Sequence, residues 1–332
     1  MKVSICTLTF NHGQYIAQAL EGFLEQKTNF AFEIIINDDA STDNTVQIIR
    51  DYQQNKKGGE RIRLYTNDNN IGMMRNSLNA LKRCSGDYVA LCEGDDYWNN
   101  PNKLQAQSDF LEANTDYSIC FHPALELKET GECTLSNPEF GGTNKTFTIE
   151  DLALGNFIHT PTVMFRNGLL KEYPSWYLNC SVGDYPLYML LARHGKIMFS
   201  PEAMSIYRVH NSSVWSSLGD VQKREKWIGV LQALIPHFEG SAKEGLKKQE
   251  FTNLIHIADH YNYHGNDNKY IRYLSKALQL DQQKTEEWLT HNYLPLVKER
   301  LVYPGGVRAG IKHLNKQVYS FILRAFKAKQ AP

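Results

Sequence analysis

The first third of the chain alternates between short β-branched, apolar runs and segments with helical spacing. The expected strands cover residues 3–9, 32–36, 61–65 and 88–92, and the expected helices cover residues 15–24, 43–52, 73–83 and 101–111. Strands that alternate with helices are typical of a parallel sheet with helices on its faces. The alternation therefore predicts an α/β fold with a mostly parallel central sheet.

The pattern changes after residue 115. Residues 117–127 and the Gly-rich stretch 139–143 predict antiparallel additions to the sheet. Further helices are expected near residues 222–238, 243–264, 267–279 and 284–300. A chain of 332 residues is long enough for one large domain and a smaller one. We therefore expect a first domain over residues 1–220 and an all-helical C-terminal region over residues 221–332.

Composition excludes some classes of protein. Lys plus Arg and Asp plus Glu both number 36, and this balance argues against a nucleic-acid binder, which usually has a basic excess. The six cysteines include no CxxC pair, which favours a reducing cytoplasm over a disulfide framework or a zinc site. We recognise no signal peptide and no apolar run near the roughly 18 residues of a membrane span.

The C-terminal segment 308–329 is basic and amphipathic. Its basic residues are not balanced by any acidic one, and its apolar residues fall on one helical face. This pattern predicts an interfacial helix at an anionic membrane surface, on the cytoplasmic side. The alternative is a helix that packs its apolar face on the body of the protein.

Three carboxylates directly follow the apolar run 88–92: Glu93, Asp95 and Asp96. Carboxylates are depleted from strands and costly to bury, so stability does not explain this cluster. Ligands of open α/β sheets bind outside the carboxyl ends of the strands, and Mg²⁺-type ions use carboxylates together with substrate phosphates. The pattern indicates a metal–diphosphate site, with a solvated acidic turn as the alternative.

Polar residues also follow the other strands. Asp39 can accept hydrogen bonds from a uracil-type base or from ribose, although an Asp-rich helix cap is equally consistent. Thr9 and Asn11 place small polar groups on the same edge of the sheet. Asn70 precedes a glycine turn into a helix, where Arg75 could stabilise a phosphate. A plain capped turn is the alternative there.

Together these motifs resemble family-two glycosyltransferases of the GT-A fold, strongly over residues 1–100 and fairly to about residue 215. The resemblance is carried by Thr-Leu-Thr-Phe-Asn at 7–11, Asn-Asp-Asp-Ala-Ser-Thr-Asp at 37–43, Asn-Ile-Gly at 70–72 and Glu-Gly-Asp-Asp at 93–96. It implies transfer of a sugar, with inversion and with Mn²⁺ or Mg²⁺, from a nucleoside diphosphate sugar (a UDP-sugar is favoured). The acceptor would be a saccharide or lipid-linked hydroxyl in bacterial surface polysaccharide or glycolipid synthesis.

The resemblance also implies roles for single residues. Asp39 matches the nucleoside-binding aspartate and Asp95 the expected metal ligand. Glu93 stands where the family usually has Asp, and its contact with ribose or with metal stays open. Asp96 is either a second metal ligand or an acceptor-side group.

Downstream motifs extend these roles. Asp184 resembles the general base, although it could also cap the helix that follows. His210, in Tyr-Arg-Val-His, resembles the histidine that reaches the metal or the diphosphate. Thr160 lies where the family often binds its acceptor, and the Trp215 ring could stack on a sugar.

Two other functions remain open. A nucleotidyltransferase would share the nucleotide-binding sheet, but it usually has a Gly-rich, basic loop near the first strand, which residues 9–13 lack. A catalytically inactive nucleotide-sugar-binding module would be supported by loss of the base, yet Asp184 and Asp95 are both present.

Overall fold

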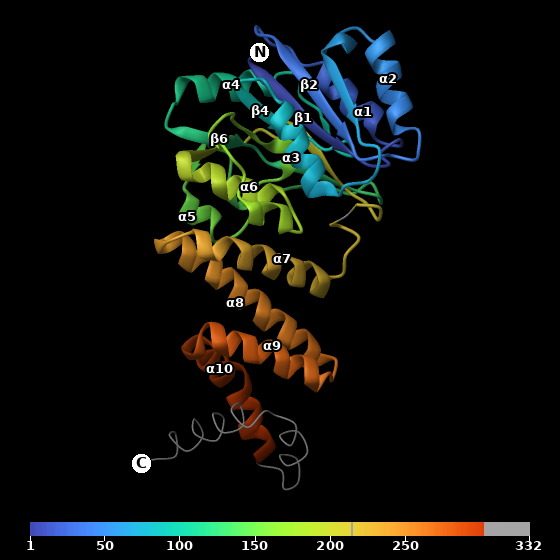
Figure 1. The fold of residues 1–332 in the computed structure, drawn as a ribbon. Helices are drawn as coiled ribbons and strands as arrows, with labels where there is room; N and C mark the ends of the chain where they lie inside the picture. Colours follow the sequence, from blue (N-terminus) through green and yellow to red (C-terminus); the bar gives the residue numbers. More distant parts are fainter. Residues whose placement is uncertain (214, 302–332) are drawn as a thin grey trace. The chain divides into compact units, whose positions relative to one another are not determined.

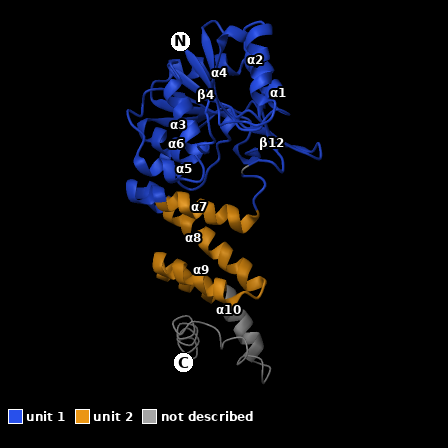
Figure 2. Ribbon diagram, turned by 45° about the vertical axis from the view of Figure 1, so that its right-hand side comes forward, with its two compact units in different colours: residues 1–218, 233–245 blue, residues 219–232, 246–332 orange. Residues whose placement is uncertain are grey.

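The computed structural model describes residues 1–213 and 215–301. Figure 2 shows its two compact units: unit 1 is formed by residues 1–218 and 233–245, and unit 2 by residues 219–232 and those from 246 onward. The sequence-based boundary near residue 220 lies close to the start of unit 2, but residues 233–245 return to unit 1. The amphipathic segment expected at 308–329 lies outside the described residues.

Unit 1 is built on an eight-stranded sheet with the strand order β3-β2-β1-β4-β10-β6-β11-β9. Figure 1 labels β1, β2, β4 and β6 of this sheet. The strands are β1 (Val3–Thr9), β2 (Phe32–Asp38), β3 (Ile62–Thr66), β4 (Tyr88–Leu91), β6 (Tyr117–Phe121), β9 (Lys145–Phe147), β10 (Met164–Arg166) and β11 (Lys196–Phe199). Neighbours from β3 to β4 are parallel, as are β6 and β11. β9 and β10 are antiparallel to their neighbours. Of the antiparallel additions expected from the sequence, β6 in 117–127 is antiparallel to β10 but parallel to β11, and the one at 139–143 is wrong, since Pro138–Phe140 form a 3₁₀ helix. The prediction of a mostly parallel sheet is confirmed.

A second sheet has the order β5-β12-β7-β8. Its strands are β5 (Tyr97–Trp98), β12 (Ser205–Val209), β7 (Ala124–Lys128) and β8 (Cys133–Leu135). β12 is antiparallel to β5, with Ile206 opposite Tyr97. This pairing places the acidic turn 93–96 beside the segment that leads to His210.

Helices cover the large sheet on both faces. In unit 1 they are α1 (Ile16–Leu24), α2 (Thr45–Asn55), α3 (Met73–Arg83), α4 (Lys103–Ala113), α5 (Ile149–Leu152) and α6 (Asp184–Leu191). α2 begins two residues later than expected, because the Asp43 carboxylate accepts a hydrogen bond from the backbone of Thr45 at 3.0 Å. α3 packs on β1 and β2.

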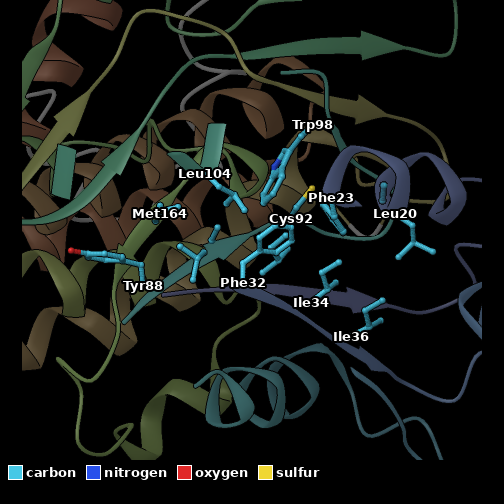
Figure 3. Packing of buried hydrophobic residues seen from close by; sticks show 14 of the residues in the cluster. Leu20, Phe23, Phe32, Ile34, Ile36, Tyr88, Cys92, Trp98, Leu104 and Met164 are labelled. Atoms are coloured by element: carbon cyan, nitrogen blue, oxygen red, sulfur yellow. The ribbon is translucent and has the colours of Figure 1, made fainter. Parts of the chain in front are cut away.

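The core of unit 1 follows from the two-residue period of the strands. Ile5 and Ile34 are fully buried in one cluster with apolar residues of α1, α2 and α4, and Figure 3 shows Ile34 near Phe32 and Ile36. Phe23 of α1 meets the Trp98 ring edge-on at 4.9 Å. Each such buried side chain contributes about 1.5–3 kcal/mol relative to its exposed state. Figure 3 also shows Cys92 in this core, so the acidic turn starts directly from packed structure.

Helices account for nearly all of the residues of unit 2 that the structure describes. They are α7 (Asp220–Leu234), α8 (Gly240–Tyr263), α9 (Asp267–Leu280) and α10 (Gln282–Leu301), and the last residues of α7 and the first of α8 belong to unit 1. Unit 2 has its own apolar core, in which Ile257, Leu274 and Leu289 are at most 2% exposed. The expected C-terminal helices are therefore confirmed as far as residue 301. Among the described helices, none combines the length and hydropathy needed to cross a membrane.

Candidate active site

The carboxyl ends of β1, β2 and β4 meet at one edge of the sheet. The backbone N–H of Asp39 donates to the Thr9 carbonyl at 2.9 Å, and that of Gly94 donates to the Leu8 carbonyl at 3.0 Å. Two non-glycine residues in the adjoining turns, Asn11 and Ala40, have positive φ angles of 56° and 63°. Such backbone outliers concentrate at functional sites.

Glu93, Asp95 and Asp96 come together as expected from the sequence. Each offers an oxygen within 4.8 Å of the others. Asp96 is 1% exposed, and its Oδ1 accepts the backbone N–H of Arg208 at 2.8 Å. Its Oδ2 and the Oδ1 of Asp95 are buried without a hydrogen-bond partner. Two carboxylate oxygens at this site are therefore left without a donor.

The cluster is electrostatically costly. Burial raises the pKa of Glu93 to about 8, and the neighbouring charges of Asp95 and Asp184 act in the same direction. Burial and the charge of Asp95 also raise the pKa of Asp96 well above its usual range. A carboxylate that is buried beside like charges is destabilised in its ionised form.

Two histidines flank Asp95. The Nε2 of His210 lies 3.1 Å from Asp95 Oδ2, and the Nε2 of His12 lies 3.8 Å from the same oxygen. Burial alone would raise the pKa of Asp95, but the hydrogen bond with His210 and the charges of both imidazoles outweigh it and lower the pKa. His12 was not expected at this site, although its place in the turn after the first strand is a signal that the sequence contains.

The residues present fit a divalent cation. Carboxylate oxygens are the ligands that Mg²⁺ and Mn²⁺ prefer, and imidazole nitrogen is also accepted by transition ions. A cation would satisfy the two unpartnered oxygens of Asp95 and Asp96. It would also relieve the like-charge repulsion that raises the pKa of Glu93.

Arg208 holds the acidic turn from β12. Its guanidinium donates to the backbone carbonyl of Asp95 and to the side chain of Gln18 in α1. It also lies over the rings of Tyr97, at 4.5 Å, and Tyr15, at 5.1 Å. Arg208 lies in the Tyr-Arg-Val-His motif, but no role for it could be predicted, because these contacts depend on the pairing of β12 with β5.

Asp39 is 3% exposed and shapes the turn that leads into α3. Its Oδ1 accepts the side-chain N–H of Asn67 and the backbone N–H of Ile71, both at 2.8 Å. Its Oδ2 accepts the backbone N–H of Gly72 at 2.9 Å, and Gly72 has a φ of 87° that favours glycine. Asn70 is exposed in the same turn and also accepts from Gly72, at 3.0 Å.

The other residues expected to bind the donor lie at the same carboxyl edge of the sheet and differ in solvent exposure. Thr9 is buried, and its hydroxyl donates to Asp38 at 2.7 Å. Asn11 is exposed, and its Oδ1 accepts the backbone N–H of Thr42 at 2.8 Å. Arg75 is exposed in the first turn of α3, where a positive charge is available to a ligand.

Asp184 is the first residue of α6 and follows the N-cap Gly183. The Asn156 amide donates to its Oδ2 at 3.3 Å. Burial raises the pKa of Asp184, although hydrogen bonds at the helix start and from Asn156 act in the opposite direction. Its charge is a minor contribution to the raised pKa of Glu93, after burial and the charge of Asp95.

The expected acceptor-side residues come from two further segments. Thr160 begins the short 3₁₀ helix Thr160–Thr162, next to His159, whose Nε2 lies 3.2 Å from Glu126 Oε1. Trp215 is half-buried in the segment between β12 and α7. Asp96 lies in the carboxylate cluster with Glu93 and Asp95.

Sequence comparisons point to one family. The model described as "Glycosyl transferase family 2" matches residues 4–173. The uncharacterized protein Rv1520 of Mycobacterium tuberculosis is 35% identical over 225 residues, which cover 68% of this chain and 63% of that relative. Poly(ribitol-phosphate) beta-N-acetylglucosaminyltransferase TarS of Staphylococcus aureus is 30% identical over 177 residues, covering 52% of this chain and 29% of TarS. The matches thus span less than two thirds of these relatives.

Solved structures share the fold. Residues 1–349 of S. aureus TarS in complex with UDP-GlcNAc match with a TM-score of 0.63 and 19% identity, over 99% of this chain and 93% of that one. The mannosyltransferase PcManGT of Pyrobaculum calidifontis, in complex with GDP-Man and Mn²⁺, matches with a TM-score of 0.57 and 13% identity, over 99% and 88% of the two chains. At these identities the likeness concerns the fold, and it confirms the expected GT-A-like architecture.

Proposed function

Since the chain belongs to glycosyltransferase family 2, we propose that it is an inverting glycosyltransferase that moves a sugar from a UDP-sugar to an acceptor hydroxyl. The observation that carries this proposal is the cluster of Glu93, Asp95 and Asp96 at the carboxyl end of β4, with two buried oxygens that lack partners. The TarS structure with UDP-GlcNAc supports the choice of nucleotide.

Asp95 and Asp96, together with the Nε2 of His210, are the groups that would hold Mn²⁺ or Mg²⁺. A bound cation would stabilise the negative charge that develops on the leaving diphosphate. Glu93 would either contact the ribose of the nucleotide or act as a further ligand of the cation. Arg208 would keep the acidic turn in place through its bond to the Asp95 carbonyl. On the nucleotide side, Asp39, Asn70, Arg75, Thr9 and Asn11 line the neighbouring strand ends.

Asp184 would act as the general base. A carboxylate with a raised pKa is a better proton acceptor near neutral pH than an ordinary aspartate. It would take the proton from the acceptor hydroxyl as that oxygen attacks the anomeric carbon. A single displacement of the diphosphate from the opposite side then inverts the configuration of that carbon.

We further propose that the acceptor is a saccharide or a lipid-linked sugar of a bacterial surface polysaccharide or glycolipid. The candidates for contact with the acceptor are Thr160 and Trp215, and also Asp96 if it does not bind the cation. Synthesis would take place in the cytoplasm, with segment 308–329 in contact with the inner face of the membrane. The name of the TarS relative, a poly(ribitol-phosphate) beta-N-acetylglucosaminyltransferase, supports a polymeric acceptor.

The test is a transfer assay with a panel of UDP-sugars and saccharide acceptors in the presence of Mn²⁺. We expect release of UDP together with a product whose anomeric configuration, measured by NMR, is opposite to that of the donor. In a parallel assay with UTP and a sugar 1-phosphate, formation of a UDP-sugar with release of pyrophosphate would identify a nucleotidyltransferase. Nucleotide-sugar binding without transfer to any acceptor would identify an inactive binding module. Retention of configuration would overturn the proposed mechanism.

A further inference from the structure

The last two turns of α8, in unit 2, carry a row of exposed histidines. His256 and His260 lie one turn apart, and His264 follows directly after the helix ends at Tyr263. The ring centroids of His260 and His264 are 4.4 Å apart. Within the described part of the chain, no hydrogen bond or ion pair occupies either imidazole, although both rings contact neighbouring tyrosines. Their nitrogens are therefore available to an external ligand.

The backbone at this point favours a positive ligand. The N–H of His264 donates to the carbonyl of His260 at 3.1 Å, so the helical geometry extends to His264. Gly265 then ends the helix with a φ of 68°. The C-terminal end of a helix carries a partial negative charge, and α8 is 24 residues long. A cation bound by His260 and His264 would lie at that end.

We propose that His260 and His264 together bind a divalent transition-metal ion such as Zn²⁺. Residues four apart lie on the same face of a helix, and two histidines at this spacing can bind one zinc ion. Imidazole nitrogen suits Zn²⁺, Ni²⁺ and Cu²⁺ better than Mg²⁺. Water would complete the coordination. This site differs in chemistry from the oxygen-rich cluster of unit 1, and the inference does not depend on the proposed transferase activity.

The experiment uses the untagged full chain, because an added histidine tag would bind the same metals. Zn²⁺ is titrated in competition with a chromophoric chelator, with excess Mg²⁺ present to occupy the carboxylate cluster. We expect wild type to bind one more equivalent of Zn²⁺ than either His260→Ala or His264→Ala. His291→Ala removes another exposed histidine of unit 2 and should bind as wild type does. His256→Ala should also retain the extra equivalent.

Circular dichroism checks that each variant keeps its helices. If His264→Ala disturbs the end of α8, the His260→Gln variant decides the test. Glutamine places a polar side chain at this exposed position of the helix and leaves the helix end unchanged. Equal Zn²⁺ binding by wild type and both variants would overturn the proposal. A loss in His291→Ala would show nonspecific surface binding, and a loss in His256→Ala but not in His264→Ala would place the metal elsewhere on the helix. Both results would contradict the assignment.

Discussion

Asp184 is the residue on which the proposed chemistry depends, and its environment sets the pH at which it can act. Burial raises its pKa, and hydrogen bonds at the start of α6 and from Asn156 only partly offset that effect. A general base works in its ionised form. The transfer rate should therefore fall with decreasing pH at a higher pH than for a solvent-exposed aspartate, whose pKa is about 4.

Substitution of Asp184 separates catalysis from binding. Asp184→Asn should lower kcat by about 10²–10⁴-fold, since the amide cannot take the acceptor proton. Binding of UDP should be unchanged, because the side chain acts on the acceptor. Steady-state kinetics and calorimetry measure the two effects. Asp109→Asn, at an exposed aspartate of α4, is the matched control. Wild-type kcat in Asp184→Asn would rule out its role as base.

Lys103 is a second titratable residue with an unusual environment. It is fully buried in α4, donates to Gln107 Oε1 at 2.7 Å, and lies 4.3 Å from the centre of the Trp98 ring. Burial lowers the pKa of Lys103 to about 7. In the unfolded chain its pKa returns to about 10.4. Between these values the unfolded chain binds more protons, so the contribution of Lys103 to stability rises with pH.

Lys103→Met tests this linkage. Relative to the variant, wild type should gain roughly 2 kcal/mol in the free energy of unfolding between about pH 6 and pH 9, because its buried ammonium loses its proton over that range. Urea unfolding of both proteins at several pH values measures the difference. A difference that stays constant with pH would show that Lys103 keeps its charge in the fold.

At the scale of elements, the turn from β4 to β5 is held on several sides. A Cβ on Gly94 would lie 2.6 Å from Thr9 Cγ2 and 2.8 Å from His12 Nδ1. The turn therefore packs tightly against the last residue of β1 and the turn after it, while Arg208 of β12 donates a hydrogen bond to it. Close packing of this kind keeps the carboxylates of Asp95 and Asp96 in one position.

Gly94→Ala should disturb that position. We expect a loss of about 1–3 kcal/mol in the free energy of unfolding, as for overpacking elsewhere, together with weaker Mn²⁺-dependent activity. Chemical denaturation and a Mn²⁺ titration of the rate measure the two effects. Gly142→Ala is the control, since no atom lies within 4 Å of its Cβ position. Wild-type stability and Mn²⁺ dependence in Gly94→Ala would contradict this account of the turn.

The elements that the sequence predicted well are those with a local signal. β1, α1 and α3 match their expected bounds closely because the two-residue or 3.6-residue period lies within each segment. The second sheet had no such signal, since β12 pairs with β5 about a hundred residues earlier. The contacts that this sheet makes in the site, above all those of Arg208, could therefore not be predicted from the sequence.

The same distinction between local and long-range signals explains which features of the site could be predicted from the sequence. Glu93, Asp95 and Asp96 were found because an acidic turn after an apolar strand is visible in the sequence. Asp39 was found by its place at a strand end, but its bonds to Ile71 and Gly72 depend on how a distant turn folds back. Residues 233–245 likewise belong to unit 1 because of tertiary contacts, so a single boundary in the sequence cannot separate the two units.

At the scale of the whole molecule, unit 1 contains every residue assigned here to transfer, and unit 2 has an independent apolar core. The proposed membrane contact depends on segment 308–329 beyond the described residues. Deletion of residues 308–332 should move the protein from the membrane fraction to the soluble fraction, because the basic charges and the apolar face are lost together. Fractionation of expressing cells measures this shift, and membrane retention of the shortened chain would refute the contact.

A matched variant separates charge from hydrophobicity. Replacement of Lys312, Lys316 and Lys327 by Glu keeps the apolar residues but reverses the charge of the polar face. Electrostatic attraction to anionic lipids predicts release of this variant as well. Release by the deletion alone would assign the attachment to the apolar face.

Calorimetric titration of UDP with and without Mn²⁺, in wild type and in Asp95→Ala, is the most direct test of the metal–diphosphate site at the end of β4. GDP and dTDP serve as comparison nucleotides. We predict that UDP binds to wild type only with the metal present, and that Asp95→Ala abolishes this binding. If UDP binds equally well without metal and to Asp95→Ala, or if no nucleotide binds when metal is present, the metal–diphosphate site at the end of β4 is wrong.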